Sequence, residues 1–213
     1  TGTCAGTNAI NAAAADVCVM AEDAELFLNA PFNAEDKVAN AGSAAFAAKA
    51  GVAAVTAADA VAAAKQAASI VALLPANNLA GPALFDFAAP SKALDLVKYS
   101  AADAIAALAD EGSTVELYAG YGKNIVTALA TINGSAVGIL ATEKAALCHK
   151  CTAKAARFVR LCDATASPLS TVRQHRGLRQ ERGRRSGWRH PSGCPYGRCL
   201  RRGYHRQGRR TGR

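Results

Sequence analysis

The stretch NIVTALATINGSAVGILAT, residues 124–142, holds two apolar runs separated by the pair Asn133-Gly134. A two-residue hairpin turn needs positive φ at both of its positions, and asparagine followed by glycine adopts such angles at little cost. The stretch therefore predicts two antiparallel strands joined by a two-residue turn. It opens a hairpin–helix–strand order that places the chain in the α/β class.

A helix and then a strand are expected after the hairpin. Thr152 can cap the helix, because its hydroxyl can accept a backbone N–H of the first turn. Lys154, Arg157 and Arg160 are expected to point away from the core. The buried face is expected to consist of four residues: Ala155, Phe158, Val159 and Cys162. Pro168 opens the following strand, PLSTV.

The preceding part of the chain predicts short strands and helices. Buried strands are expected at 16–20 and 25–31. Helical patterns occupy three stretches: 42–50, 59–74 and 91–110. The second helix is expected to bury one face: Val61, Ala64, Ala68 and Val71. Residues 74–90 are rich in proline, glycine and asparagine, which indicates a linker and a domain boundary.

The net charge of +9 is concentrated at the C-terminal end of the chain. From Arg173 onward there are 14 arginines, no lysine and one acidic residue, whereas residues 1–172 carry 11 basic and 15 acidic residues. Such asymmetry is typical of a nucleic-acid-binding arm, with salt-sensitive and sequence-independent binding. Arginine, glycine and proline together are also what GC-rich DNA encodes when it is read out of frame.

Codons can be chosen that encode the arginine-rich tail and that, read one base later, encode an apolar strand end, a Gly-Phe turn and a helix of mixed charge. We therefore expect a frame change near Ser170–Arg173. Residues 173–213 are then a disordered basic tail with no evolved role in nucleic-acid binding. DNA sequencing across this point, with a protein mass, tests the hypothesis, because an intact frame encoding the tail refutes it.

The seven cysteines follow no regular disulfide spacing, which fits a reducing compartment. Cys148 and Cys151 have the spacing of half a zinc site, but residues 1–172 contain no second matching pair. Packing cysteines are expected there, and no metal. The sequence shows no apolar run of about 18 residues and no signal pattern, so a cytoplasmic protein is expected. Its first residue is not methionine, and the chain is expected to begin within a longer protein.

Two segments carry a resemblance to a known family. GTCAGTNAINAAAAD at 2–16 resembles the pattern G-x-C-A-G-G-A-x-x-x-P-A-x-x-D, and KAARFVRLCDA at 154–164 resembles K-A-A-R-F-x-R-x-C-D-A. Both patterns belong to the carboxyltransferase subunits of biotin-dependent acyl-CoA carboxylases and decarboxylases. The resemblance implies a crotonase-like spiral of ββα units. Residues 1–80 would form the latter half of the first domain, and residues 82–172 the opening of the second.

The resemblance also implies the chemistry. Backbone N–H groups of Gly6 and Thr7 would stabilise an enolate oxygen, and Ala5 and Gly6 would contact the acyl-CoA. Thr7 stands where the family has glycine, which narrows the approach of a ligand, and Ala12 replaces the family's proline. Lys154 and Arg157 could meet CoA phosphates, but a solvated helix face is the preferred interpretation.

The family's partners follow from the same resemblance. There is no Met-Lys-Met segment, so biotin would arrive on a separate carrier protein. Further partners would be a biotin carboxylase or membrane decarboxylase subunits, within a homo-oligomer whose active sites lie between subunits. The substrate is expected to be a short acyl-CoA: acetyl-, propionyl-, malonyl- or methylmalonyl-CoA.

Two alternatives remain at this point. A crotonase-type hydratase or isomerase would share the fold but needs side-chain acids or bases, and biotin-dependent carboxyl exchange would separate it from a carboxyltransferase. The other alternative is a nucleic-acid-binding protein that uses the tail. The chain as written is expected to be poorly folded, because the strand end and helix lost by the frame change would leave apolar surface of the second domain uncovered. It is also expected to be inactive alone, because the family's second oxyanion hole lies beyond residue 172.

Overall fold

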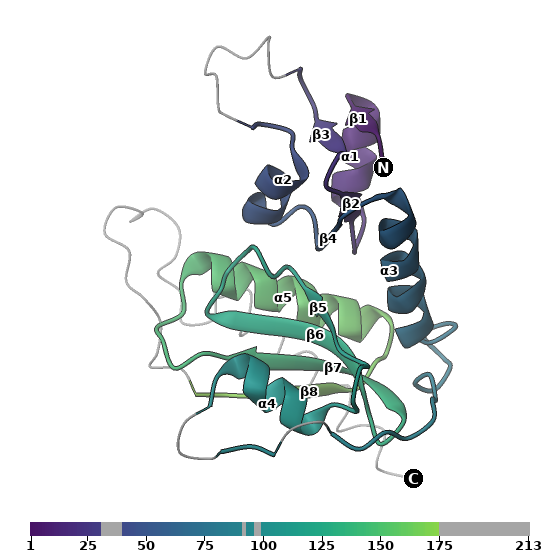
Figure 1. The fold of residues 1–213 in the computed structure, drawn as a ribbon, viewed down its shortest axis with the longest axis vertical. Helices are drawn as coiled ribbons and strands as arrows, with labels where there is room; N and C mark the ends of the chain where they lie inside the picture. The colour runs from purple at the N-terminus through teal and green to yellow at the C-terminus, as the bar shows by residue number, and fades with distance from the viewer. Residues whose placement is uncertain (31–39, 91–92, 96–98, 175–213) are drawn as a thin grey trace. The chain divides into compact units, whose positions relative to one another are not determined.

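The computed structural model describes residues 1–30, 40–90, 93–95 and 99–174. It divides into two compact units (Figure 1). The first unit comprises Thr1–Ala72 together with Glu116–Tyr121, and the second comprises the described residues of Leu73–Val115 and those from Gly122 onward. The family-based division into 1–80 and 82–172 stays a prediction. The arginine-rich tail lies outside the described residues from position 175 onward.

The first unit consists of short strands and small helices. Strand β1 pairs in parallel with β3, and β2 pairs in parallel with β4. The elements follow in the order β1 (Thr3–Ala5), α1 (Thr7–Ala14), β2 (Val19–Ala21), β3 (Glu25–Phe27), α2 (Ala44–Ala50), β4 (Val55–Ala57) and α3 (Ala60–Leu73). The strands expected at 16–20 and 25–31 are thus present only in part, over 19–21 and 25–27, and residue 31 lies outside the described residues. The prediction that the second strand is buried is wrong, because Glu25 is exposed and Leu26 and Phe27 are half-buried.

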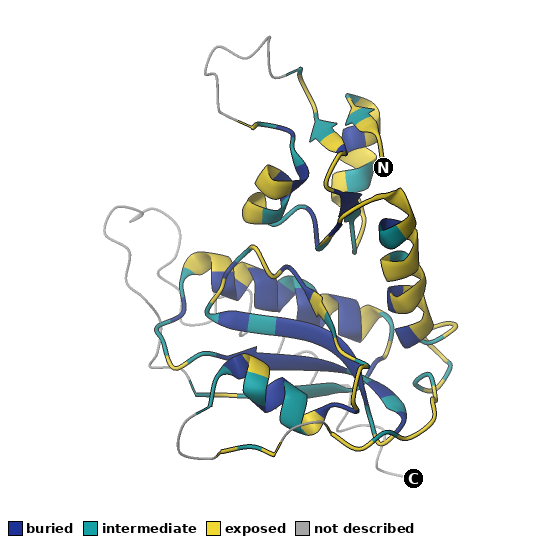
Figure 2. Ribbon diagram, in the orientation of Figure 1, coloured by how far each residue is buried: buried dark blue, intermediate teal, exposed yellow. Residues whose placement is uncertain are grey.

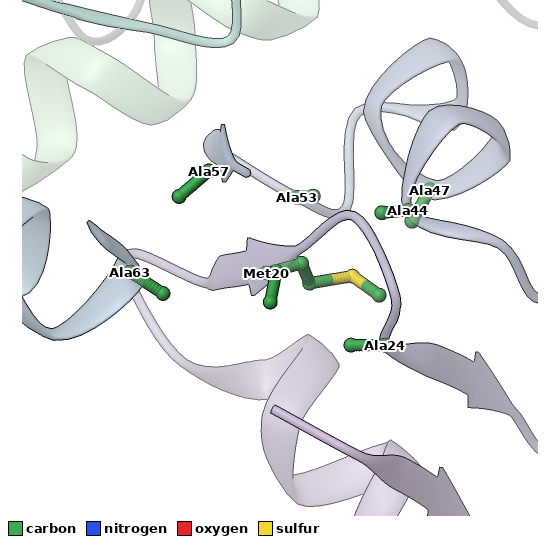
Figure 3. Close-up of a cluster of buried hydrophobic side chains, with 8 residues drawn as sticks. Met20, Ala24, Ala44, Ala47, Ala53, Ala57 and Ala63 are labelled. Atoms are coloured by element: carbon green, nitrogen blue, oxygen red, sulfur yellow. The ribbon is translucent and has the colours of Figure 1, made fainter. Parts of the chain in front are cut away.

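Met20 lies at the centre of the first unit's core. Its side chain extends among alanines from four elements or their flanks (Figure 3). The buried alanines of this cluster are Ala21, Ala24, Ala44, Ala47, Ala53, Ala57 and Ala63. Because alanine side chains are small, the backbones of these elements can approach closely around the Met20 side chain.

Helix α3 buries a different face from the one expected. The buried residues of α3 are Ala63, Ile70 and Leu73, whereas Val61 and Val71 are 64% and 68% exposed. Ala64 and Ala68 are exposed as well, and Figure 2 shows exposed residues along most of the helix. The prediction for this face is therefore wrong. The helix is apolar on nearly every side, so its sequence period does not single out one face.

The second unit is built on a four-stranded sheet of order β5-β6-β7-β8. Its elements are α4 (Ala101–Leu108), β6 (Ile125–Ile132), β7 (Ser135–Thr142), α5 (His149–Ala164) and β8 (Leu169–Val172). Of β5 (Val115–Leu117), only Val115 is counted with this unit. Strands β6 and β7 are antiparallel, and β8 runs parallel to β7. The predicted hairpin and the predicted strand after Pro168 are both confirmed.

Helices α4 and α5 cover opposite faces of this sheet (Figure 1). Ile105 of α4 packs in one cluster with Ile139 of β7. The neighbouring Gly138 points to the other face, because side chains alternate along a strand. A Cβ at Gly138 would lie 2.5 Å from Cys162 Sγ and 3.2 Å from Phe158 Cζ, so α5 packs directly against the β7 backbone.

Helix α5 begins earlier than its sequence pattern suggests. Cys148 occupies the N-cap, and Thr152 lies inside the first turns, where its hydroxyl donates to the His149 carbonyl at 2.8 Å. The prediction that Thr152 caps the helix is wrong. The predicted apolar face is confirmed, since all four of its residues are buried: Ala155, Phe158, Val159 and Cys162.

Two further expectations need correction. Lys154 is only 2% exposed and does not point into solvent, whereas Arg160 is exposed and Arg157 is half-buried. Of the described residues in the helix expected at 91–110, only Ala101–Leu108 are helical, and Ser100 and Asp103 form a capping box at the start of α4. Residues 91–92 and 96–98 lie outside the described residues.

The Asn133-Gly134 turn has positive φ angles of 51° and 73°, as the sequence predicts. Substituting Gly134 with alanine is expected to destabilise the chain by about 1–3 kcal/mol, because a Cβ there would be strained and would also collide with the Phe85 carbonyl. Asn133→Gly keeps both backbone N–H groups and should change stability by less than about 0.5 kcal/mol. Thermal unfolding followed by circular dichroism compares the two variants, and equal effects would contradict this account.

Asp110 anchors the same turn from within the protein, where it is 4% exposed. Its carboxylate accepts hydrogen bonds from Gly134 N–H at 2.7 Å, the Thr131 hydroxyl at 2.7 Å and Asn133 N–H at 3.0 Å. Burial raises the pKa of Asp110, but these hydrogen bonds outweigh burial and hold the pKa below its ordinary value of 3.8. The folded protein therefore stabilises the ionised form of the Asp110 carboxylate relative to the protonated form.

This carboxylate is expected to make stability depend on pH in the acid range. Its contribution is complete above the ordinary value of 3.8 and is lost as the pH falls through the lower folded-state pKa. Asp110→Asn should therefore be less stable than the unsubstituted chain at pH 7, and the difference should shrink below about pH 4. Urea unfolding at a series of pH values measures this, and a pH-independent difference would contradict the assignment.

Candidate functional site

The turn between β1 and α1 contains the three residues that the sequence singles out. Ala5 ends the strand, Gly6 is the N-cap and Thr7 is the first residue of the helix. Gly6 has φ 60° and ψ −133°, a combination that glycine adopts without a Cβ penalty. Among the described residues beyond its two chain neighbours, no heavy atom lies within 4 Å of the position of a Cβ at Gly6, so there is open space on that side of the backbone.

The amide groups of Gly6 and Thr7 are not equivalent. Gly6 N–H donates to the Phe27 carbonyl at 3.2 Å, which extends the β1–β3 pairing by one hydrogen bond. The carbonyl of Gly6 accepts from Ala9 N–H at 3.0 Å, the first bond of the helix. Thr7 N–H belongs to the first turn of α1, where a helix supplies no acceptor, and the described residues show none for it.

Sequence reasoning treated both amides as equal donors and did not foresee this difference. Strand β1 pairs with β3, in which Glu25 lies opposite Thr3 although it is 22 residues further along the chain. The sequence near Gly6 does not indicate that its N–H will pair with the Phe27 carbonyl. Of the Gly6 and Thr7 amides, only that of Thr7 has no acceptor among the described residues.

The other residues considered from the sequence lie elsewhere. Lys154 is buried in α5, so the prediction that it belongs to a solvated helix face is wrong. Arg157 is half-buried, and a contact of either side chain with CoA phosphates stays a prediction. Cys162 is also buried, and this burial raises the pKa of its thiol to about 12, so it packs as an unreactive thiol. Within the described residues, no group of three or more His, Cys, Asp and Glu side chains could hold a metal ion.

Two features escaped the sequence interpretation. The Asp110 carboxylate, which holds the hairpin turn, gives no local signal because its partners lie 21 to 24 residues away. The contact of Cys148 with Cys151, whose sulfurs lie 3.0 Å apart, was predicted only as packing. The spacing of these two cysteines was the available signal for a closer interaction.

The strand–helix arrangement, with its glycine turn and its hairpin–helix–strand unit, is the crotonase-like α/β fold of carboxyltransferases. Residues 1–183 match the carboxyl transferase domain family, and the chain belongs to that family. Within the described residues, no helix is long and apolar enough to cross a membrane.

Curated relatives support the family assignment. The methylmalonyl-CoA carboxyltransferase 12S subunit of Propionibacterium freudenreichii subsp. shermanii is 32% identical over 189 residues, which cover 79% of this chain and 36% of that protein. The propionyl-CoA carboxylase beta chain of Rattus norvegicus is 40% identical over 77 residues, which cover 34% of this chain and 14% of the relative. The chain therefore spans about a third of the length of the 12S subunit.

Solved structures lead to the same family. The transcarboxylase 12S hexamer with hydrolysed methylmalonyl-coenzyme A bound superposes with a TM-score of 0.75 at 30% identity, covering 85% of this chain and 40% of that one. A single-chain, multi-domain long-chain acyl-CoA carboxylase has a TM-score of 0.70 at 24% identity, over 85% of this chain and 20% of the other, which is a likeness of fold.

Proposed function

We propose that this chain is part of a carboxyltransferase that moves a carboxyl group between carboxybiotin and a short acyl-CoA. The observation that carries the proposal is the family match over residues 1–183. Substrates in the range from acetyl-CoA to methylmalonyl-CoA are consistent with the relatives, which include the methylmalonyl-CoA carboxyltransferase 12S subunit and propionyl-CoA carboxylase beta chains.

The glycine turn is the proposed site of enolate stabilisation. When CO2 adds to the α-carbon of a thioester or leaves it, negative charge develops on the thioester oxygen, and a fixed N–H aimed at that oxygen lowers the barrier. Thr7 N–H is the open donor, and the positive end of α1 reinforces it. Gly6 has no side chain to block the approach of a ligand, and its own N–H donates to the Phe27 carbonyl. Ala5 and Gly6 would line the acyl-CoA.

Carboxybiotin would supply the CO2 in this reaction, and the biotin nitrogen freed by its release would accept the proton of the α-carbon. This division of labour removes the need for a side-chain acid or base at the turn. The biotin would be attached to a separate carrier protein. A biotin carboxylase or membrane decarboxylase subunits would be further partners, with the enzyme a homo-oligomer in the cytoplasm.

The test uses a chimera in which residues 1–172 replace the matching segment of the 12S subunit. We expect the chimera to bind propionyl-CoA and to exchange labelled carboxyl groups between methylmalonyl-CoA and biotin. A folded, assembled chimera that hydrates enoyl-CoA without biotin-dependent exchange would contradict the proposal. The chain alone should show no turnover, because it spans about a third of the length of the 12S subunit.

A further inference from the structure

The N-terminal end of α5 holds two cysteine side chains in direct contact. Cys148 is the N-cap of this 16-residue helix, and Cys151 lies in its first turn. Their sulfur atoms are 3.0 Å apart, within hydrogen-bonding distance for two thiols. The proposed carboxyl transfer uses neither residue.

We propose that Cys148 and Cys151 form a reversible dithiol–disulfide couple that exchanges with small-molecule disulfides of the glutathione class. The proposal is independent of acyl-CoA chemistry. It rests on the contact between the sulfurs, on their unequal exposure and on the position of Cys148 at a helix N-terminus.

The two cysteines have different exposure, which sets the order of attack. Cys148 is partly exposed, whereas Cys151 is fully buried. An incoming disulfide therefore reaches Cys148 first. Cys151, held against Cys148 and shielded from solvent, can then resolve the mixed disulfide.

The surroundings of Cys148 favour its thiolate form. Partial burial raises the pKa of Cys148, but a hydrogen bond from the Cys151 thiol and the N–H groups of Cys151 and Lys150 outweigh it and lower the pKa below its usual value. Burial raises the pKa of Cys151, and its hydrogen bond to Cys148 raises it further. A nucleophilic outer thiol beside a protonated inner thiol is the arrangement that thiol–disulfide exchange requires.

The backbone around the pair is closely packed. A Cβ at Gly122 would lie 3.1 Å from the Cα and N of Cys151, so this loop rests directly on the first turn of α5. Asn124 Nδ2 donates to the Ala146 carbonyl at 2.9 Å and holds the segment that leads into Cys148. Thr152 N–H donates to the Cys148 carbonyl at 3.1 Å. The sulfurs are thus kept together by the fold.

A metal site would need further ligands. Among the described residues, no third His, Cys, Asp or Glu side chain joins the two thiols in a group that could hold a metal ion. Two thiols in contact need no third group to form a disulfide bond when an oxidant is present.

The exchange proceeds in two balanced steps. The Cys148 thiolate attacks one sulfur of oxidised glutathione, which forms a mixed disulfide and releases one glutathione thiolate. Cys151 then loses its proton to solvent and attacks the Cys148 sulfur, which forms the Cys148–Cys151 bond and releases the second glutathione thiolate. The protein dithiol loses two electrons, and the glutathione disulfide gains them.

The full chain is incubated with a graded ratio of oxidised to reduced glutathione, alkylated and digested with trypsin. Cleavage after Lys150 separates the two cysteines, so their disulfide appears as two linked peptides that reduction releases. A non-reducing gel excludes links between chains. We expect the linked peptides to accumulate as the ratio rises and to disappear when it is reversed.

Three variants make the test specific. Cys148→Ser and Cys151→Ser should abolish the linked peptides completely, and Cys18→Ser in the first unit should leave them unchanged. Cys151→Ser should accumulate a glutathione adduct at Cys148, whereas Cys148→Ser should gain none at the buried Cys151. Circular dichroism verifies that each variant folds.

Two results would overturn the proposal. One is the absence of linked peptides in the unsubstituted chain while other cysteines become glutathionylated. The other is an adduct at Cys151 of Cys148→Ser that forms as fast as the adduct at Cys148 of Cys151→Ser.

Discussion

Thr7→Pro is expected to lower the rate of carboxyl transfer by roughly 10²–10³-fold, which corresponds to about 2.7–4 kcal/mol of transition-state stabilisation. Proline removes the N–H of Thr7, for which the described residues show no acceptor. Proline is well tolerated at the first position of a helix, because its N–H has no partner there and its φ suits the helix. The substitution therefore deletes the proposed donor at little cost to folding.

The measurement is carboxyl exchange between methylmalonyl-CoA and biotin in the chimera with the 12S subunit. Thr7→Ala is the matched control, because it removes the side chain and keeps the amide, and it should retain activity within a fewfold of the unsubstituted chimera. The melting temperatures of both variants should be similar. Equal activities of Thr7→Pro and Thr7→Ala would remove Thr7 N–H from the mechanism and leave the family assignment intact.

Phe158→Ala is expected to destabilise the second unit by about 3–5 kcal/mol, the range for truncation of a fully buried aromatic side chain. Phe158 is 0% exposed, and its ring lies against the β7 backbone at Gly138. Cys162 of the same helix also lies against Gly138, so α5 already packs directly on the β7 backbone. The helix and the strand therefore cannot easily move closer together to fill the space of a deleted ring. Removal of the ring should therefore leave a cavity.

Hydrogen exchange of amides in β6 and β7 measures the effect within the second unit itself. Exchange through global opening should accelerate by the factor that corresponds to the lost free energy. Phe87→Ala is the control, because Phe87 is 63% exposed, and it should change stability by less than about 0.5 kcal/mol. Similar protection in the two variants would show that α5 does not stabilise the sheet through Phe158.

The candidate site could be predicted from the sequence as a location but not as a set of donors. The glycine turn and its place between a strand and a helix follow from residues 2–16 and their resemblance to a family pattern. Whether each amide is free depends on pairing with β3, which the sequence near the turn does not specify. The roles of Gly6 and Thr7 in binding an oxygen remain a prediction that the proline substitution tests.

The sequence by itself determined the features that neighbouring residues control. The Asn133-Gly134 turn is one example, because positive φ at two adjacent positions is a local preference of those residues. The apolar face of α5 is another, since Ala155, Phe158, Val159 and Cys162 recur at helical spacing and all four are buried.

Only the tertiary structure decided which face of α3 is buried, that Lys154 lies inside, that Cys148 caps α5 and that Asp110 holds a distant turn. These outcomes depend on contacts with segments far along the chain. An alanine-rich helix offers nearly equivalent faces to such segments, so the energy that selects one of them comes from the partner surface, which a local pattern does not contain.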